Sequence, residues 1–392
     1  MLSRSIITGL VLVSSCGLGL SATAQTAFPV SLAVKGQPDI SPRHIVPTGA
    51  RTAILPGGMP TQMQTEEVWK PACSNQVQVS QLDLILMSSR HAADFGGGLP
   101  GIRIVDNTPS PRAGLNVVYV LGGSVPAAAV ASFGLAEAYL EAQFTGDTMT
   151  LTVTVSFAAL PPGVIGGTGS AYGTLAWADS RSTLVAGMDA SDTIQSSLPA
   201  GTTIPVRYTA AATTNENRIF WTLANFKANG GVVGGNDASM QYSTAFPFDF
   251  NPANGVTANT ISLVDVIIHE TGHSMGFGSG VDFRVNDIET HDIFRFRSTD
   301  GASDFNPDSA AEFGVRPRWA VRNNPNNDVQ FDTISGIEYA LSDGSPWQAS
   351  HFREQFPAIG IMDPAFSYGE TFFPNYLRAS DFTAFDAIGW NR

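Results

Sequence analysis

The stretch SLVDVIIHETGHSMGFGS, residues 262–279, constrains the fold of this chain more than any other part of it. Ser262 followed three residues later by Asp265 predicts the start of a helix, because a serine side chain caps the first turn and an acidic side chain caps back. An apolar run follows the cap, and Gly276 stands where a glycine in the left-handed conformation commonly ends a helix. The pattern therefore predicts a short, buried helix.

Two histidines and a glutamate lie within this predicted helix. His269 and His273 are four residues apart, so both imidazoles project from one helical face, and Glu270 lies beside them. The pattern is HExxH, in which the imidazoles bind zinc and the carboxylate reaches a water molecule held between them. Chance is a poor explanation, because the chain has only six histidines and an apolar helix has little use for three ionisable side chains. A catalytic zinc site needs three protein ligands and an open fourth position, so a third ligand must be found.

The charge balance excludes some classes of partner. Asp and Glu number 34 against 21 Lys and Arg, which gives a net charge of −13 and a pI near 4.8. So few basic residues cannot neutralise many phosphates, which argues against a nucleic-acid or anionic-membrane partner. The chain has 392 residues, of which 43% are hydrophobic, enough to bury a large core in one or two domains. No particular oligomeric state is predicted.

Residues 1–24 have the three parts of a secretory signal peptide. Arg4 supplies the basic region, residues 6–13 the apolar core, and residues 22–24 (Ala-Thr-Ala) the cleavage site. These features predict secretion to the periplasm or the cell exterior. A minor alternative is the Val-Ser-Ser-Cys sequence ending at Cys16, which resembles a lipoprotein box and would leave that cysteine lipidated. No other apolar run approaches the roughly 20 residues that span a bilayer, so no transmembrane segment is expected.

Residues 25–128 form the least informative region, rich in Pro, Gly and Ser. Residues 77–86 and 115–121 alternate as strands do, so the region is expected to be a pro-segment or a small β domain. Signal-peptide cleavage leaves Cys73 without a second cysteine, so no intramolecular disulfide is expected. The Cys73 thiol is then either structural or, as a thiolate, a cap on the zinc of a latent form.

Clearer patterns occur in residues 129–392, which are expected to form the main domain. Helical periodicity predicts a helix over residues 130–144, and alternation predicts a strand over residues 148–157. The glycine-rich residues 166–170 lack the lysine of a phosphate-binding loop and predict a turn. Residues 239–250 predict a strand close to the zinc helix, where an edge strand can pair with an extended substrate.

The third ligand does not follow from the helix itself. In the extended motif HExxHxxGxxH the third ligand stands at position 279, which is a serine here. His291 has an acidic context that favours a surface group or a salt-bridge partner. His44 and His91 have no ligand-like neighbours. Each is predicted to lie at the surface or to have its hydrogen bonds satisfied within the protein. The candidates after the helix are Asp282, Glu289, His291, Asp292 and His351.

Four features follow the zinc helix in a fixed order. They are a long insertion over residues 280–350, a histidine in the sequence QASHF, Met362 in a tight proline-containing turn, and an amphipathic ending of helical type over residues 380–390. Together with the HETGHSMGF helix, this order resembles the leishmanolysin-like branch of the metzincins and secreted bacterial metalloproteases of that layout. The resemblance covers residues 130–392.

The resemblance implies both a fold and a function. It implies an α+β fold, with a metzincin-like catalytic domain that has a mixed twisted sheet, an active-site helix and a methionine turn, preceded by the β-rich N-terminal region. It implies that His269, His273 and His351 bind one catalytic zinc, that Glu270 is the general base, and that Met362 lies beneath the metal. The implied function is a secreted zinc endopeptidase that hydrolyses protein or peptide substrates with a zinc-activated water.

One further residue pattern, in the insertion, is weaker. Asp304, Asn306 and Asp308 resemble the start of a calcium loop, but Pro307 interrupts it and Val315 stands where the loop needs glutamate. Calcium is therefore only a secondary expectation.

Two other classes of function stay open at this point. One is a zinc hydrolase of a non-protein substrate, and the other is a secreted surface or adhesion module with a structural zinc. Glu270 argues against the second, because a closed structural site has no use for a base beside the metal. Tyr368, after the methionine turn, is a candidate for polarising a substrate carbonyl, although its offset differs from that of the family's tyrosine.

Overall fold

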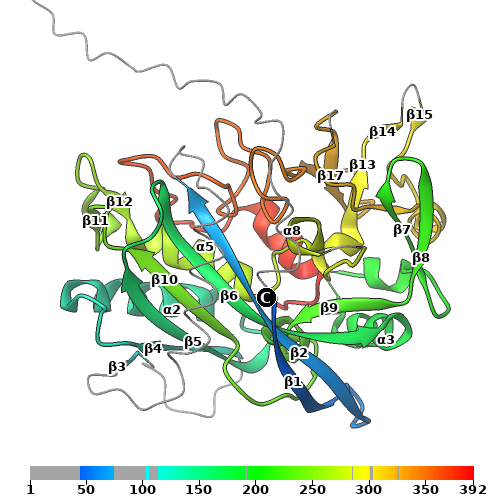
Figure 1. Ribbon diagram of the computed structural model, residues 1–392, viewed down its shortest axis with the longest axis horizontal. Helices are drawn as coiled ribbons and strands as arrows, with labels where there is room; N and C mark the ends of the chain where they lie inside the picture. The colour runs from blue at the N-terminus through cyan, green and yellow to red at the C-terminus, as the bar shows by residue number, and fades with distance from the viewer. Residues whose placement is uncertain are drawn as a thin grey trace, which may run out of the picture. The chain divides into compact units, whose positions relative to one another are not determined.

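The computed structural model describes residues 45–74, 103–105, 114–190, 192–284, 286–300, 303–324 and 326–392 (Figure 1). All of them belong to one compact unit, Lys35–Arg392, whereas a second unit, Met1–Val34, lies outside the described residues. The predicted signal peptide and Cys16 therefore fall outside the described residues, as do His44, His91 and the strand predicted over residues 77–86. Within the described part of the chain, no helix has the length and hydropathy needed to cross a membrane.

A mixed sheet of eight strands underlies the fold, as expected. β4, β5 and β10 run parallel, and the other neighbours pair antiparallel. Figure 1 shows the sheet twisting along its strands, as sheets of L-residues do. In spatial order the strands are β1 (Ile45–Ile54), β2 (Pro60–Ser74), β6 (Val164–Ala176), β10 (Ala238–Ser243), β5 (Thr148–Ala158), β4 (Gly114–Leu121) and β3 (Arg103–Val105), and β9 (Arg218–Thr222) also pairs with β6.

The strands from the N-terminal region belong to this same sheet. β2 pairs with β6, and β4 pairs with β5, so the boundary expected near Val130 falls between two elements of one compact unit. Cys73 stands in β2, where its backbone is opposite Gly166 of β6. The N-terminal region thus contributes strands on both sides of β6, β10 and β5.

Two helices pack on the sheet and on each other. α2 (Val130–Gln143) contacts β4 and α5 (Leu263–Ser274), and α5 also contacts β6. The predicted helix over residues 130–144 and the predicted strand over residues 148–157 are confirmed by α2 and β5. Phe133 of α2 packs edge-on against Tyr119 of β4 and Tyr242 of β10, with ring centroids 5.3 and 5.7 Å apart. Aromatic packing therefore fixes α2 over the middle of the sheet.

The turn predicted over residues 166–170 is wrong, because these residues lie within strand β6. Gly166 allows α5 to approach the sheet closely. A Cβ on Gly166 would come within 3.1 Å of the Glu270 carboxylate and 3.3 Å of the Tyr242 ring. The glycine-rich sequence, which predicts a turn, therefore belongs to a strand on which a helix packs closely.

The strand predicted over residues 239–250 is confirmed in part, but the edge position expected for it is wrong. β10 covers the first part of this range and lies between β5 and β6, with both of its edges already paired and every residue buried. The second part forms the short strand β11 (Phe248–Asp249), which pairs with β12 (Ile261–Ser262). β10 therefore offers no free edge to a substrate.

The insertion after α5 folds into small sheets and short helices, and the chain ends in a helix, as predicted. The remaining elements are η1 (Ala127–Ala129), α3 (Trp177–Gly187), η2 (Ile194–Ser197), β7 (Ile204–Thr209), β8 (Ala212–Glu216), α4 (Leu223–Ala228), η3 (Pro252–Asn254), α6 (Gly280–Phe283), η4 (His291–Phe294), β13 (Arg295–Arg297), β14 (Thr299–Asp300), β15 (Ser303–Asp304), α7 (Ala310–Phe313), β16 (Arg318–Trp319), β17 (Val329–Asp332), β18 (Glu338–Ala340) and α8 (Ala379–Ala387).

The residues that resemble a calcium loop lie in this insertion. The Asn306 amide donates to the Glu338 carboxylate at 2.6 Å and to that of Asp332 at 3.4 Å. The backbone N–H of Asp308 donates to Glu312 at 2.9 Å. These contacts join the loop to β17, β18 and α7, which is a structural role.

Candidate metal centre

Helix α5 holds two of the predicted ligands, and both of its ends are as predicted. The Ser262 side chain accepts a hydrogen bond from the backbone N–H of Asp265. The Asp265 carboxylate accepts from the Thr371 hydroxyl at 2.9 Å and from the Phe372 N–H at 2.6 Å. Gly276 has a φ of 109°, which a residue with a side chain rarely adopts. The helix is buried along its whole length, so its side chains are fixed by their surroundings.

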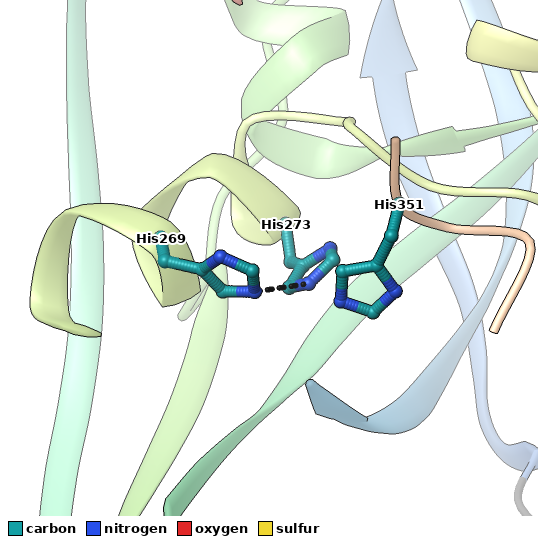
Figure 2. Close-up of side chains that lie close together, drawn as sticks. All are labelled: His269, His273 and His351. Carbon is teal, nitrogen blue, oxygen red and sulfur yellow. Dashed lines mark hydrogen bonds between the residues drawn. The ribbon is translucent and has the colours of Figure 1, made fainter. Parts of the chain in front are cut away.

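The structure brings His269, His273 and His351 together. All three are buried, and their candidate ligand nitrogens lie within 4.8 Å of one another. The ring centroids are 4.9 Å apart for His269 and His273, 4.9 Å for His273 and His351, and 5.3 Å for His269 and His351. Figure 2 shows the rings of the two helix residues meeting that of His351, which comes from a distant segment. Within the described ranges, this is the one group of three or more His, Cys, Asp or Glu side chains that can hold a metal ion.

Backbone carbonyls orient the three rings. Nδ1 of His269 lies 2.7 Å from the Ile361 oxygen, and Nδ1 of His273 lies 2.7 Å from the Phe277 oxygen. Nδ1 of His351 lies 3.3 Å from the Gln348 oxygen. Because a carbonyl only accepts, each Nδ1 carries the hydrogen and each neutral ring keeps an acceptor at Nε2. Such bonds fix the tautomer and the direction of metal-binding histidines.

The Nε2 atoms of His269 and His273 are 3.2 Å apart. Two acceptor nitrogens at this distance repel each other unless a proton or a cation lies beside them. Burial disfavours the proton, since it lowers the pKa of His269 to about 4. The separation also fits a cation, because two nitrogens bound tetrahedrally at about 2.0 to 2.1 Å from zinc lie about 3.3 Å apart. The three histidines are therefore suited to hold a metal ion.

Glu270 is buried next to these histidines and is held by strand β6. The Thr168 hydroxyl lies 2.7 Å from Oε2 of Glu270 and 3.0 Å from the Glu270 backbone oxygen. One turn along the helix, the Ser170 hydroxyl lies 3.4 Å from the backbone oxygen of His273. Thr168 and Ser170 are two apart on one strand, so both face α5. Sequence reasoning missed them, although threonine and serine alternate with glycine there, because the stretch was interpreted as a turn.

Met362 packs against α5 at Gly272, beside His273 in the sequence. A Cβ on Gly272 would come within 2.5 Å of the Met362 sulfur, so the absence of a side chain there makes room for this methionine. The Asp381 carboxylate of α8 accepts from the N–H groups of Ile361 at 3.0 Å and Met362 at 3.4 Å. The same segment carries the carbonyl that orients His269, so α8 supports the centre indirectly.

The acidic candidates for the third ligand hold the insertion instead. Asp292 accepts from the Ser279 hydroxyl at 2.6 Å and from the Gly280 N–H at 2.7 Å. Asp282 accepts from the N–H groups of Ala349 and Ser350 at 2.6 and 2.8 Å. Neither belongs to the group of three histidines. Their hydrogen bonds instead fix the backbone of residues 280, 349 and 350.

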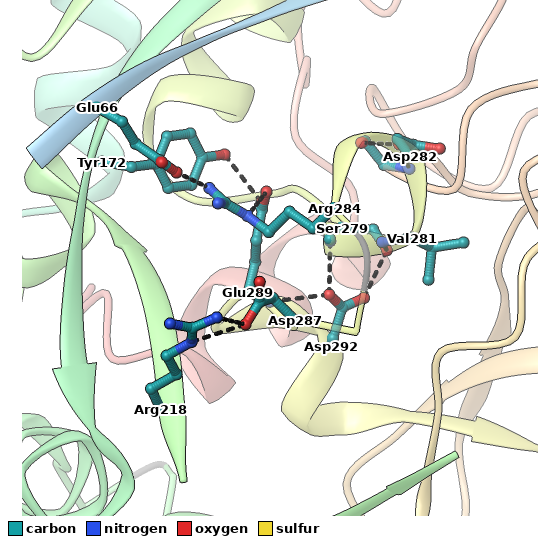
Figure 3. A network of polar contacts seen from close by, with 12 residues as sticks. Glu66, Tyr172, Arg218, Ser279, Val281, Asp282, Arg284, Asp287, Glu289 and Asp292 are labelled. Carbon is teal, nitrogen blue, oxygen red and sulfur yellow. Dashed lines mark hydrogen bonds and ion pairs between the residues drawn. The ribbon is translucent and has the colours of Figure 1, made fainter. Parts of the chain in front are cut away.

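Glu289, the remaining acidic candidate, belongs to a buried network (Figure 3). Its carboxylate accepts from the Tyr172 hydroxyl at 2.9 Å and lies 3.6 Å from the Arg284 guanidinium. Arg284 also forms an ion pair with Glu66 of β2 and lies 3.5 Å above the Phe220 ring. The network therefore ties the insertion to β2 and β6.

Of the two roles expected for His291, a surface group or a salt-bridge partner, the surface one is wrong. Its side chain is fully buried between Phe277 and Phe331, with ring centroids 4.2 and 4.9 Å apart. Its acidic neighbours in sequence, Glu289 and Asp292, face the partners described above. The charged context therefore did not predict exposure. Tyr368, the candidate for carbonyl polarisation, is about half exposed at 49%.

Comparisons with protein-family models, with curated proteins and with solved structures found no match for this chain. The similarity to leishmanolysin-like metzincins rests on the sequence motifs and their order.

Proposed function

We propose that this protein is a secreted zinc-dependent endopeptidase of the leishmanolysin-like metzincin type. The observation that carries the proposal is the convergence of three buried imidazoles beside Glu270, with the Nδ1 atom of each ring placed at a backbone carbonyl. A structural zinc site commonly has four protein ligands, whereas three histidines leave one position for water or substrate. The predicted signal peptide supports secretion.

His269, His273 and His351 would hold the zinc. Bound there, zinc supplies a Lewis acid that polarises a peptide carbonyl and lowers the pKa of a water molecule. Three neutral imidazoles leave the positive charge of the ion undiminished, and the buried surroundings strengthen its effect on developing negative charge.

Glu270 is the residue placed to move protons. Its carboxylate accepts a proton from the attacking water and passes it to the amine nitrogen as the peptide bond breaks. The Thr168 hydroxyl donates to Oε2, which restrains the carboxylate next to His269 in the sequence of α5. The backbone contacts of the three imidazoles hold them in place, so little reorganisation is needed during the reaction.

The test uses metal analysis and cleavage of casein and a peptide library. The parent protein is expected to contain one zinc and to cleave both. Glu270→Ala should keep the zinc, and its cleavage rate should be about 10²- to 10⁴-fold lower than that of the parent, as is typical when a general base is lost. Glu270→Ala cleaving at the parental rate would overturn the mechanism. Zinc without peptide cleavage would point to the alternatives, a non-protein substrate or a non-catalytic module.

A further inference from the structure

His351 needs support that His269 and His273 obtain from their helix, because it lies outside any helix or strand. It stands at the end of a loop whose two ends are joined. The Ser342 N–H donates to the His351 carbonyl at 3.1 Å, and Leu341 and Phe352 form an isolated β-bridge. The base of the loop is closed in this way, but the body of the loop must be fixed by other groups.

Asp282 holds the residues directly before His351. The residue is 3% exposed, and its carboxylate accepts from the Ala349 N–H at 2.6 Å through Oδ1 and from the Ser350 N–H at 2.8 Å through Oδ2. The Ser350 hydroxyl also donates to Oδ2. One carboxylate therefore fixes two consecutive peptide units, and the next residue is the ligand.

Arg295 holds the same loop from its carbonyl side. This arginine is fully buried on β13 and donates from Nη1 to the Ala349 oxygen at 3.2 Å and from Nη2 to the Ser342 oxygen at 2.5 Å. Its Nε donates to the Trp319 oxygen at 3.1 Å. Ala349 is thus held at its N–H by Asp282 and at its carbonyl by Arg295. The negative charges of Asp292, Asp343 and Asp282 act on the Arg295 guanidinium and offset part of the cost of burying it.

We propose that Asp282 is a positioning residue that sets the affinity of the centre for its metal by holding His351, with Arg295 assisting from the other side of the loop. The inference rests on the proposed metal centre. It assigns Asp282 a role one step away from the ion, since its two oxygens are occupied by the backbone before the ligand. Removing a group that hydrogen-bonds a metal ligand typically weakens metal binding by about 10- to 100-fold, and we expect an effect of this order for a group that fixes the backbone next to the ligand.

The experiment compares the full chain with Asp282→Ala, Asp282→Asn and His351→Ala. Zinc Kd is measured by competition with a chelator, and the absorption spectrum of the Co²⁺-loaded protein reports ligand geometry. Asp282→Ala should raise the Kd about 10- to 100-fold and move the cobalt spectrum towards that of His351→Ala. Asp282→Asn keeps one acceptor oxygen and should lie between parent and Asp282→Ala, which keeps the test useful if Asp282→Ala does not fold.

Asp332→Ala is the matched control. Asp332 lies in the same insertion, is 2% exposed and accepts a backbone N–H, that of Ile334, at 2.6 Å. Its removal should lower the thermal stability and leave the zinc Kd and the cobalt spectrum as in the parent. Equal effects of Asp332→Ala and Asp282→Ala on the Kd would show that Asp282 affects metal binding only through the stability of the insertion, and not by positioning His351.

The outcomes separate the inference from the proposed function. A folded Asp282 variant with the parental Kd and cobalt spectrum, in a parent that binds zinc, overturns the positioning role alone. A parent that binds neither metal removes the proposed function, and the inference with it. Loss of affinity in Asp282→Ala, partial loss in Asp282→Asn and none in Asp332→Ala supports the inference.

Discussion

The hydroxyl of Tyr119 on β4 lies 2.8 Å from the hydroxyl of Thr271 on α5. Thr271 itself donates to the Ile267 carbonyl at 2.7 Å, so its oxygen accepts from Tyr119. This bond joins a residue from the N-terminal region to the helix that carries HExxH. Towards the opposite edge of the sheet, Glu66 of β2 pairs with the buried Arg284. The N-terminal strands are therefore built into the support of the candidate metal centre.

We therefore expect the active protein to retain β1, β2 and β4. Removing them would leave the edges of β6 and β5, which now pair with β2 and β4, without a partner strand. It would also leave Arg284 without Glu66, one of its acidic partners. N-terminal sequencing and intact mass of active secreted material should show a start upstream of Ile45. A fully active species that begins near Val130 would contradict this expectation.

Tyr119→Phe tests the contact itself. Phenylalanine fills the same space but cannot donate, so the unfolding free energy should fall by about 0.5 to 1.5 kcal/mol. Denaturant unfolding at fixed zinc concentration gives the value. Unchanged stability would mean that the hydroxyl pair contributes nothing.

Thr168→Val should slow the reaction. Valine has nearly the shape of threonine but leaves Oε2 of Glu270 without the hydroxyl that holds it at 2.7 Å. A hydrogen bond to a charged group is worth about 1.5 to 3 kcal/mol, so kcat should fall roughly ten- to a hundredfold while zinc content stays the same.

Thr168→Ser is the matched control, because it keeps the hydroxyl. It should retain most of the parental kcat. A serine variant as slow as the valine variant would show that the methyl group, and packing, matter more than the hydrogen bond.

Gly272→Ala should destabilise the protein. Its Cβ would come within 2.5 Å of the Met362 sulfur and 3.3 Å of the Phe385 ring. Overpacking of this kind typically costs about 1 to 3 kcal/mol, read as a lower Tm. Gly234→Ala is the control, since a Cβ there meets nothing within 4 Å. A parental Tm for Gly272→Ala would show that Met362 moves aside freely.

Stability should also depend on pH through Asp147. Burial raises the pKa of this carboxyl from 3.8 to about 7, against hydrogen bonds from Asn391 that lower it. A raised pKa means that the folded state binds the proton more tightly than the unfolded state. The contribution to stability is therefore present below about pH 4 and is lost as the pH rises through about 7.

Asp147→Asn removes this titration. In zinc-free protein between pH 4.5 and 7.5, the Tm of the parent should fall with rising pH more steeply than that of the variant. The two stabilities should diverge by at most about 4 kcal/mol across the range. Parallel Tm profiles would mean that Asp147 does not titrate differently on folding.

The sequence predicted those structural features that depend on residues close together in the chain. The start and end of α5, with Ser262 and Gly276, depend on spacings of a few residues, and so does the shared face of His269 and His273. The helix α2 and the strand β5 followed from their periodicity for the same reason. The mixed sheet was expected from the family resemblance and is present.

Long-range partners could not be predicted in this way. Asp282 acts on residues 67 and 68 positions later, and Thr168 on a residue 102 positions later. No spacing rule encodes such pairs, so Asp282 was interpreted as a possible ligand. A glycine-rich stretch predicts a turn when only its neighbours in sequence are considered. In β6, however, Gly166 makes room for α5, which lies about 100 positions later in the chain.

The loop that carries His351 has a consequence for the assembly of the metal centre. Helix α5 carries two of the imidazoles, and the third follows Ala349, which is held between Asp282 and Arg295. The three imidazoles therefore meet only where both the helix and the insertion are folded. As a protease, a half-folded molecule would lack the complete centre that it needs to cut its neighbours.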